Sequence, residues 1–126
     1  MAHPQEVPVS TPVGPYSPHR RVGDWIAVSG QIGIADGHLV GGGLEAQLRQ
    51  ALTNLDGVLA EAGASRSHVV SATVYLRHMS DFARLNDVWI DAFDAPRPAR
   101  AAVGVTEMPL GALVEISAWA HIGGDG

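Results

Sequence analysis

The chain has 126 residues, a net charge of −5 at pH 7, no cysteine and no lysine, since all eight basic residues are arginines. An acidic chain is a poor match for nucleic acid or an anionic membrane as main partner, because both bind basic surfaces. Without cysteine there is no disulfide, thiolate nucleophile or thiolate metal site, and without lysine there is no Schiff-base chemistry of the pyridoxal-phosphate or class I aldolase kind.

The length fits a single domain that buries a hydrophobic core. Residues 1–13 are rich in proline and polar residues, so we expect an extended lead-in there and one domain over 14–126. The N-terminal residues lack a basic stretch followed by an apolar core, and no run of about 18 apolar residues follows. These patterns predict a cytoplasmic protein without a membrane partner.

The first third of the chain is predicted to form a hairpin after a turn-rich loop. Two prolines exclude a helix from residues 14–18, where Tyr16 lies. A short strand around 20–22 and a second at 25–32 are separated by Gly-Asp, which is typical of a hairpin. Gly30, within the second strand, predicts a bulge or a close approach of another segment. Loops follow at 36–37 and 41–43.

Two amphipathic helices and three strands are predicted for the rest of the chain. Apolar residues at i, i+3, i+4 and i+7 spacing from 44 to 62, followed by Gly63, predict a helix with one buried stripe. Alternation predicts a strand at 69–76, with one face formed by Val70, Ala72, Val74 and Leu76. A second helix, capped by Ser80 or Asp81, has an inner face formed by Phe82, Leu85, Trp89 and Phe93. Residues 94–98 end it, and strands follow at 101–105 and 113–122.

The order ββαβαββ predicts an α+β fold in which a mixed β-sheet carries two helices on one face. Each helix has a single apolar stripe, so both can cover the same side of the sheet. The other side of the sheet then needs a cover of its own. In so small a domain we expect that cover to be a second copy of the chain, and hence a homo-oligomer.

Two charged residues stand out, one just before a predicted strand and one within another. Arg100 opens an apolar segment, and its planar guanidinium matches a carboxylate group; a surface ion pair with Glu107 or Glu115 is the alternative. Glu115 lies between Val114 and Ile116, so alternation directs it to the opposite face from both. It faces either plain solvent or a ligand, for which it would position water or accept a proton.

Polar and aromatic residues elsewhere give weaker indications. Tyr16 is either a packed loop aromatic or a phenol that donates to a ligand. Ser29 has no G-x-S-x-G setting, which argues against a nucleophile. The six histidines show no metal-binding spacing, so we expect no metal site. The three tryptophans are expected in the core or at an interface: Trp25, Trp89 and Trp119.

Taken together, these segments resemble the Rid family, the reactive intermediate deaminases also called YjgF or RidA proteins. The resemblance covers nearly the whole chain, from about residue 14 to 120. No single motif is specific, but their order and spacing are. The motifs are Gly14-Pro15-Tyr16-Ser17, Val28-Ser29-Gly30-Gln31-Ile32, Asn86, Pro98-Ala99-Arg100, Met108-Pro109 and Val114-Glu115-Ile116.

The resemblance implies a chorismate-mutase-like α+β fold, with residues 14–126 as one Rid-like domain, assembled as a homotrimer with active sites between subunits. It also implies hydrolysis of reactive 2-imino or enamine acids, such as 2-iminopropanoate and 2-iminobutanoate, to 2-keto acids and ammonia. Arg100 would bind the substrate carboxylate and Glu115 would orient water. Tyr16, Ser29 and Ala102 would line the pocket, and no metal or cofactor would be needed.

The chain departs from the family pattern at two positions. Ala102 stands where many relatives have a cysteine, which affects pocket shape rather than the implied mechanism. Arg97 stands where relatives often have an aromatic residue, and it is either a solvated loop arginine or a second cation that favours a larger or dianionic substrate.

Three other functions remain open from the sequence. A non-catalytic small-ligand-binding or holdase-like trimer is the main alternative, because the family includes members without the arginine. Ribonuclease activity is attributed to some relatives, but the acidic charge disfavours it. Chorismate mutase shares the implied fold and also binds a dicarboxylate through arginines, but the motifs around Tyr16 and Ser29 favour the deaminase.

Overall fold

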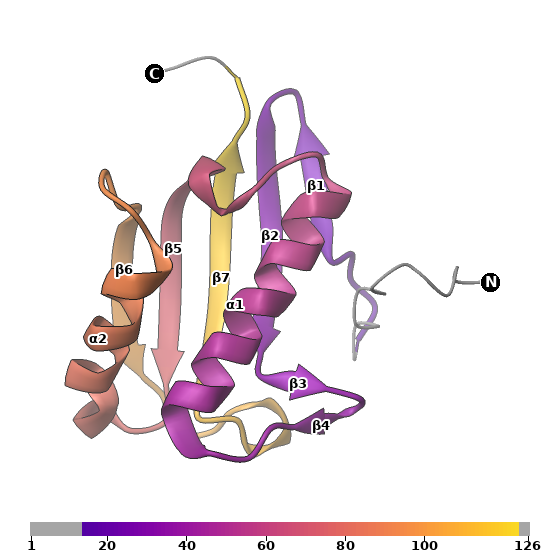
Figure 1. Ribbon diagram of the computed structural model, residues 1–126. Helices are drawn as coiled ribbons and strands as arrows, with labels where there is room; N and C mark the ends of the chain where they lie inside the picture. Colours follow the sequence, from indigo (N-terminus) through magenta and orange to yellow (C-terminus); the bar gives the residue numbers. More distant parts are fainter. Residues whose placement is uncertain (1–13, 124–126) are drawn as a thin grey trace.

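The computed structural model of the chain describes residues 14–123, so the expected lead-in over 1–13 lies outside the described residues. Five strands form one mixed sheet in the order β1-β2-β7-β5-β6, in which β5 and β6 are parallel and the other neighbours antiparallel. Strands β1 and β6 are therefore the sheet edges (Figure 1). The five strands are β1 (His19–Val22), β2 (Trp25–Ile32), β5 (Val69–Leu76), β6 (Ala99–Gly104) and β7 (Val114–His121).

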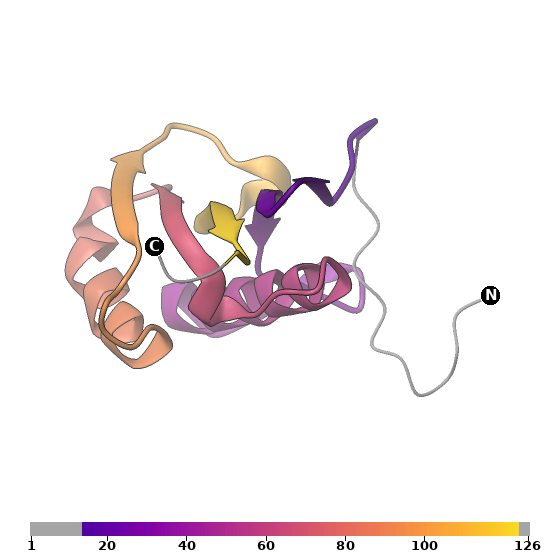
Figure 2. The same cartoon turned by 90° about the horizontal axis from the view of Figure 1, so that it is seen from above.

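Two helices cover one face of the sheet, α1 (Gly43–Glu61) and α2 (Phe82–Ala92). Figure 2 shows both on the same side, with α1 below the central strands and α2 beside β6. The apolar stripe of α1 is fully buried and contributes Leu48, Leu55 and Leu59 to the core. It packs against alternate residues of the strands, such as Ile26, Val74 and Ile116. The expected α+β fold, its mixed sheet and its two helices are confirmed.

The β2 strand contains both features that Gly30 predicts. Its pairing with β7 shifts register between Val28 and Gln31, which is a β-bulge. At the same place, a Cβ added to Gly30 would overlap the carboxylate of Glu115. The glycine therefore allows β2 to bend and β7 to bring a charged side chain against its backbone. The preceding hairpin is also as predicted, with Gly23 at φ +59° in the turn.

Some short elements differ from the sequence expectation. A two-stranded ribbon, β3 (Ile34–Ala35) and β4 (His38–Leu39), flanks the predicted turn, and its strands are too short to show alternation. The amide of Asn54 on α1 ties this ribbon to the helix by donating to the carbonyls of Ile32 and Ile34. Single turns of 3₁₀ helix occur at Arg66–His68, Met79–Asp81 and Pro109–Gly111.

Two side-chain placements and one side-chain capping bond were predicted wrongly. Val70 is exposed and does not share the buried face of Ala72, because a register shift between Val69 and Ser71 reverses the alternation there. Phe82 is 40% exposed, since it lies at the first turn of α2, beyond the buried core. Asp81 is at the N-cap position of α2 but makes no capping bond with its side chain.

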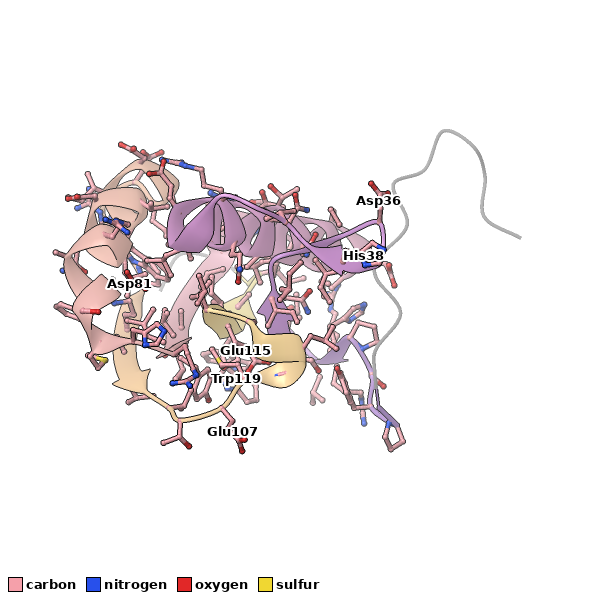
Figure 3. All side chains as sticks on the ribbon, turned by 90° about the horizontal axis from the view of Figure 1, so that it is seen from below. Asp36, His38, Asp81, Glu107, Glu115 and Trp119 are labelled. Atoms are coloured by element: carbon pink, nitrogen blue, oxygen red, sulfur yellow. The ribbon has the colours of Figure 1, made fainter. Side chains whose placement is uncertain are left out.

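The sheet face away from the helices is open in the single chain. It carries Trp25 and Trp119, which are 46% and 53% exposed and contact each other edge to face. Trp89, by contrast, is buried in the core. Figure 3 shows Glu115 and Trp119 on this open side, away from α1. Within residues 14–123, no helix has the length and apolar character needed to cross a membrane.

Candidate active site

Arg100 lies within β6 rather than before it, because the strand begins at Ala99, two residues earlier than predicted. Its register partner on β5 is Ala72, which is buried under the helices, so Arg100 faces the helix side. There one terminal nitrogen donates to Oδ1 of Asn86 on α2 at 2.7 Å. The guanidinium carbon lies 5.1 Å from the ring centroid of Trp89 and 5.6 Å from that of Phe82.

These contacts hold the guanidinium without neutralising it. Within residues 14–123, the ion pairs do not include Arg100, so neither Glu107 nor Glu115 pairs with it. Burial lowers the pKa of Arg100, but an arginine remains charged at neutral pH. An amide and two aromatic faces stabilise the cation and leave donor groups available to an anion.

The guanidinium of Arg100 borders a shallow, open depression of about 430 Å³ between α2 and β6. Its lining consists of Asn86, Trp89, Ile90, Arg97, Pro98 and Arg100. Two arginines and an amide give this depression a positive, hydrogen-bonding wall, and a tryptophan and an isoleucine give it an apolar one. A small organic anion fits this chemistry.

The free edge of β6 adds backbone donors beside Arg100. The N–H of Val105 points inward and donates to the carbonyl of Leu76 on β5 at 2.9 Å. Because N–H groups alternate in direction along a strand, those of Arg100 and Ala102 point away from the sheet. The methyl group of Ala102 packs against the core. Ala102 can therefore contribute to a site through its N–H.

Glu115 lies on the other face of the sheet. Its neighbours in the sequence, Val114 and Ile116, are fully buried on the helix side, and its register partners are Tyr75 and Ile32. Its carboxylate sits over the bulge at Gly30. Burial raises the pKa of Glu115 above its ordinary value. A carboxylate in this state is a better proton acceptor than an ordinary surface glutamate.

Ser29 is next in the chain to Gly30, against which this carboxylate lies. Ser29 precedes the bulge, and its hydroxyl donates to the carbonyl of Ser17 at 2.6 Å, while its N–H donates to the carbonyl of Pro18. These two bonds hold the Tyr16 loop against β2. Tyr16 is 47% exposed, so its phenol is accessible. Ser29 and the Glu115 carboxylate thus lie at the same bulge of β2, and Ser29 ties the loop that carries Tyr16 to this strand.

A single chain does not bring Arg100 and Glu115 together. Arg100 projects from the helix face of an edge strand, and Glu115 projects from the open face of the central strand β7, with β5 between them. The predicted site residues therefore form two groups: Arg100 with Ala102, and Glu115 with Ser29 and the loop that carries Tyr16. Strand order, which the sequence does not reveal, determines this separation.

The structure also adds residues that the sequence did not assign to the site. Phe82 and Trp89 were predicted as core residues from their helical spacing, yet both flank the Arg100 guanidinium. Asn86 lies four residues after Phe82, so the same spacing places it on that face of α2. Among residues 14–123, no three histidine, aspartate or glutamate side chains are grouped so that they could hold a metal ion.

Comparisons with known proteins place this chain among related sequences over most of its length. The family model described as endoribonuclease L-PSP matches residues 8–122. A protein of the RutC family from Pyrococcus abyssi is 42% identical over 112 residues, which covers 87% of this chain and 88% of the relative. A 2-iminobutanoate/2-iminopropanoate deaminase from Bos taurus is 44% identical over 108 residues, which covers 84% of this chain and 79% of the relative.

A solved structure has the same fold. RidA from the Antarctic bacterium Psychrobacter sp. PAMC 21119 superposes with a TM-score of 0.86 at 38% sequence identity. The match covers 89% of this chain and 92% of the other.

Proposed function

The chain belongs to the Rid family, that of the matched RidA and endoribonuclease L-PSP proteins, and we propose that it hydrolyses 2-imino acids to 2-keto acids and ammonia. The observation that carries the proposal is the setting of Arg100: a charged guanidinium, held by Asn86 between two aromatic rings, beside an open depression. Such a group binds the carboxylate of a small substrate through paired hydrogen bonds. Relatives named 2-iminobutanoate/2-iminopropanoate deaminase support the substrate class.

The reaction needs a bound carboxylate, a positioned water and a proton acceptor. Water adds to C2 of the protonated imine as Glu115 accepts one of its protons, which gives a tetrahedral amino alcohol. That proton passes to the amino nitrogen, the C–N bond breaks, and the hydroxyl proton leaves with ammonia as ammonium. The products are one 2-keto acid and one ammonium ion for each imine and water. An enamine enters the same path once C3 is protonated.

We further propose that each site is formed by two subunits of a homotrimer. Arg100 and the edge N–H of Ala102 would come from one subunit, and Glu115, Tyr16 and Ser29 from its neighbour. The location of the two groups on opposite faces of one sheet supports this arrangement. The exposed tryptophans of the open face support an assembly in which a second copy covers it.

The proposal is tested with imines made in solution by an amino-acid oxidase acting on alanine or 2-aminobutanoate. Semicarbazide traps the imine, so a deaminase lowers the yield of semicarbazone. We expect the wild-type protein to suppress trapping, and Arg100→Ala to do so at least about 100-fold less, since truncation leaves the substrate carboxylate unpaired. Arg49→Ala, at an exposed position on α1 and so on the helix side of the sheet, is the matched control.

Two other results would overturn the proposal. If the wild type and Arg100→Ala suppressed trapping equally, Arg100 would have no role in the reaction. Lack of any imine hydrolysis, with the trimer intact, would leave a non-catalytic ligand-binding or holdase-like protein.

The family description names an endoribonuclease, but the net charge of −5 disfavours RNA as a substrate. An RNA cleavage assay at low salt completes the test, and we expect no cleavage.

A further inference from the structure

A second guanidinium borders the same depression as Arg100. Arg97 lines it together with Asn86, Trp89 and Pro98. Arg97 is exposed, and the hydrogen bonds and ion pairs within residues 14–123 do not involve its side chain. The acidic group nearest to it in sequence, Asp94, makes no ion pair with it. The guanidinium of Arg100 is thus held by contacts within the fold, and that of Arg97 is available to a ligand.

The backbone holds Arg97 at a defined distance from Arg100. Proline at 98 fixes its own φ and restricts the preceding residue to extended conformations, so Arg97 begins from a constrained position. Three residues of extended chain separate the two Cα atoms by roughly 10 Å. Both residues line one depression and have long side chains, which gives their guanidinium groups the reach needed for the two ends of a four- or five-carbon dicarboxylate.

We propose that Arg97 binds the second carboxylate of a dianionic substrate, so that this chain prefers 2-imino dicarboxylates such as 2-iminosuccinate and 2-iminoglutarate. The choice of substrate rests on the proposed deaminase function; the anion preference of the depression does not. Arg100 binds the carboxylate next to the imine, and Arg97 binds the distal one. The net charge of −5 repels dianions at long range, so the preference depends on these two local cations.

Binding of unreactive analogues tests the anion preference without turnover. Glutarate and pentanoate have the same carbon chain and differ by one carboxylate. Calorimetry should show tighter binding of glutarate by the wild type, and Arg97→Gln should reduce that preference about fivefold, the size expected of one partly exposed ion pair. Arg97→Lys should retain most of it. Arg49→Gln, at an exposed position on α1, should retain all of it, and added salt should weaken the preference in the wild type.

Turnover then tests the substrate class. We expect the wild type to have a higher kcat/KM for 2-iminoglutarate than for 2-iminobutanoate, and Arg97→Gln to raise KM for the dianion alone with little change in kcat. An unchanged glutarate preference in Arg97→Gln would overturn the inference and leave the deaminase intact. Hydrolysis of neither imine by the wild type would instead overturn the proposed function, and the glutarate measurements would still decide the role of Arg97.

Discussion

At the residue scale, the proposed chemistry depends on how Arg100 is kept charged and available. A carboxylate partner inside the chain would compete with the substrate for the guanidinium. A neutral amide and two aromatic rings orient it without that competition. The fold therefore stabilises the cation on one side and leaves the other side to an anion.

Asn86 should act as a positioning residue for Arg100. Asn86→Asp replaces the amide with a carboxylate within hydrogen-bond distance of the guanidinium, so it should compete with substrate and raise KM about tenfold. Asn86→Ala should also weaken binding, but less. Steady-state kinetics with 2-iminobutanoate measure both. Gln50→Ala, which removes a hydrogen bond within α1, is the control, and equal KM values in all four proteins would exclude the positioning role.

Glu115 should give the reaction a distinctive pH dependence. Burial raises its pKa above 4.5, so the carboxyl is still protonated at pH values where an ordinary glutamate is ionised. A protonated carboxyl cannot accept a proton from water, so kcat/KM should fall as the pH falls through this raised pKa. The measurement is the pH profile of kcat/KM, corrected for uncatalysed hydrolysis. A profile that bends at or below the ordinary glutamate value would contradict the assignment, and Glu115→Gln should be slow at every pH.

At the element scale, the bulge of β2 positions the Glu115 side chain. An extra residue in β2 bends the strand, and the absence of a side chain at Gly30 leaves room for the carboxylate of the neighbouring strand. The same bulge holds Ser29 against the Tyr16 loop. One irregularity in one strand thus arranges half of the proposed site.

Gly30→Ala should damage activity more than stability. Its Cβ would overlap the Glu115 carboxylate, so that side chain must turn away, and we expect kcat to fall at least about tenfold. Gly41→Ala is a matched control, because a Cβ there meets nothing within 4 Å. Activity and thermal unfolding of the two variants are compared. Full activity in Gly30→Ala would show that the position of Glu115 does not matter.

Local patterns in the sequence predicted the elements well. Helix α1 runs over Gly43–Glu61 against a predicted 44–62, because its apolar spacing has one clear period and a glycine follows it. Gly30 predicted a bulge because a glycine within a strand commonly marks a bulge or the close approach of another segment. Phe82 and Val70 were misplaced, since the same patterns cannot show where a helix extends past the core or where a register shifts.

The site itself needed information that local patterns do not carry. Alternation correctly directed Glu115 away from Val114 and Ile116, but the face occupied by Arg100 depends on its register with β5. The separation of the two residues depends on strand order, which pairs residues distant in the sequence. The contacts of Arg100 with Phe82 and Trp89 likewise arise from the packing of α2 on an edge strand.

At the scale of the whole molecule, the open sheet face stands out because a single chain leaves its tryptophans exposed to solvent. Half-exposed Trp25 and Trp119 contact each other there. Figure 3 shows Glu115 on the same side as Trp119. Covering this face with another copy would bury the tryptophans and enclose Glu115 beside a neighbouring β6 edge. Assembly and catalysis would then depend on the same surface.

A charged residue introduced on the open sheet face should dissociate the assembly. We expect a native mass of three times the 13.2-kDa chain, and Trp119→Asp should lower it because a carboxylate would be buried without a partner. Light scattering after gel filtration measures the mass. Ala60→Asp, on the exposed side of α1, is the control and should stay assembled. A Trp119→Asp protein with unchanged mass would place the interface elsewhere.

The most direct test of a site shared between subunits is complementation between two inactive variants. Arg100→Ala and Glu115→Gln are prepared separately, unfolded together and refolded as a mixture. If each site takes Arg100 from one subunit and Glu115 from its neighbour, random mixing in equal amounts leaves about a quarter of the sites intact. We predict that about a quarter of the wild-type deaminase activity returns. Activity no greater than the average of the two separate variants, in trimers shown to contain both, would contradict the shared site.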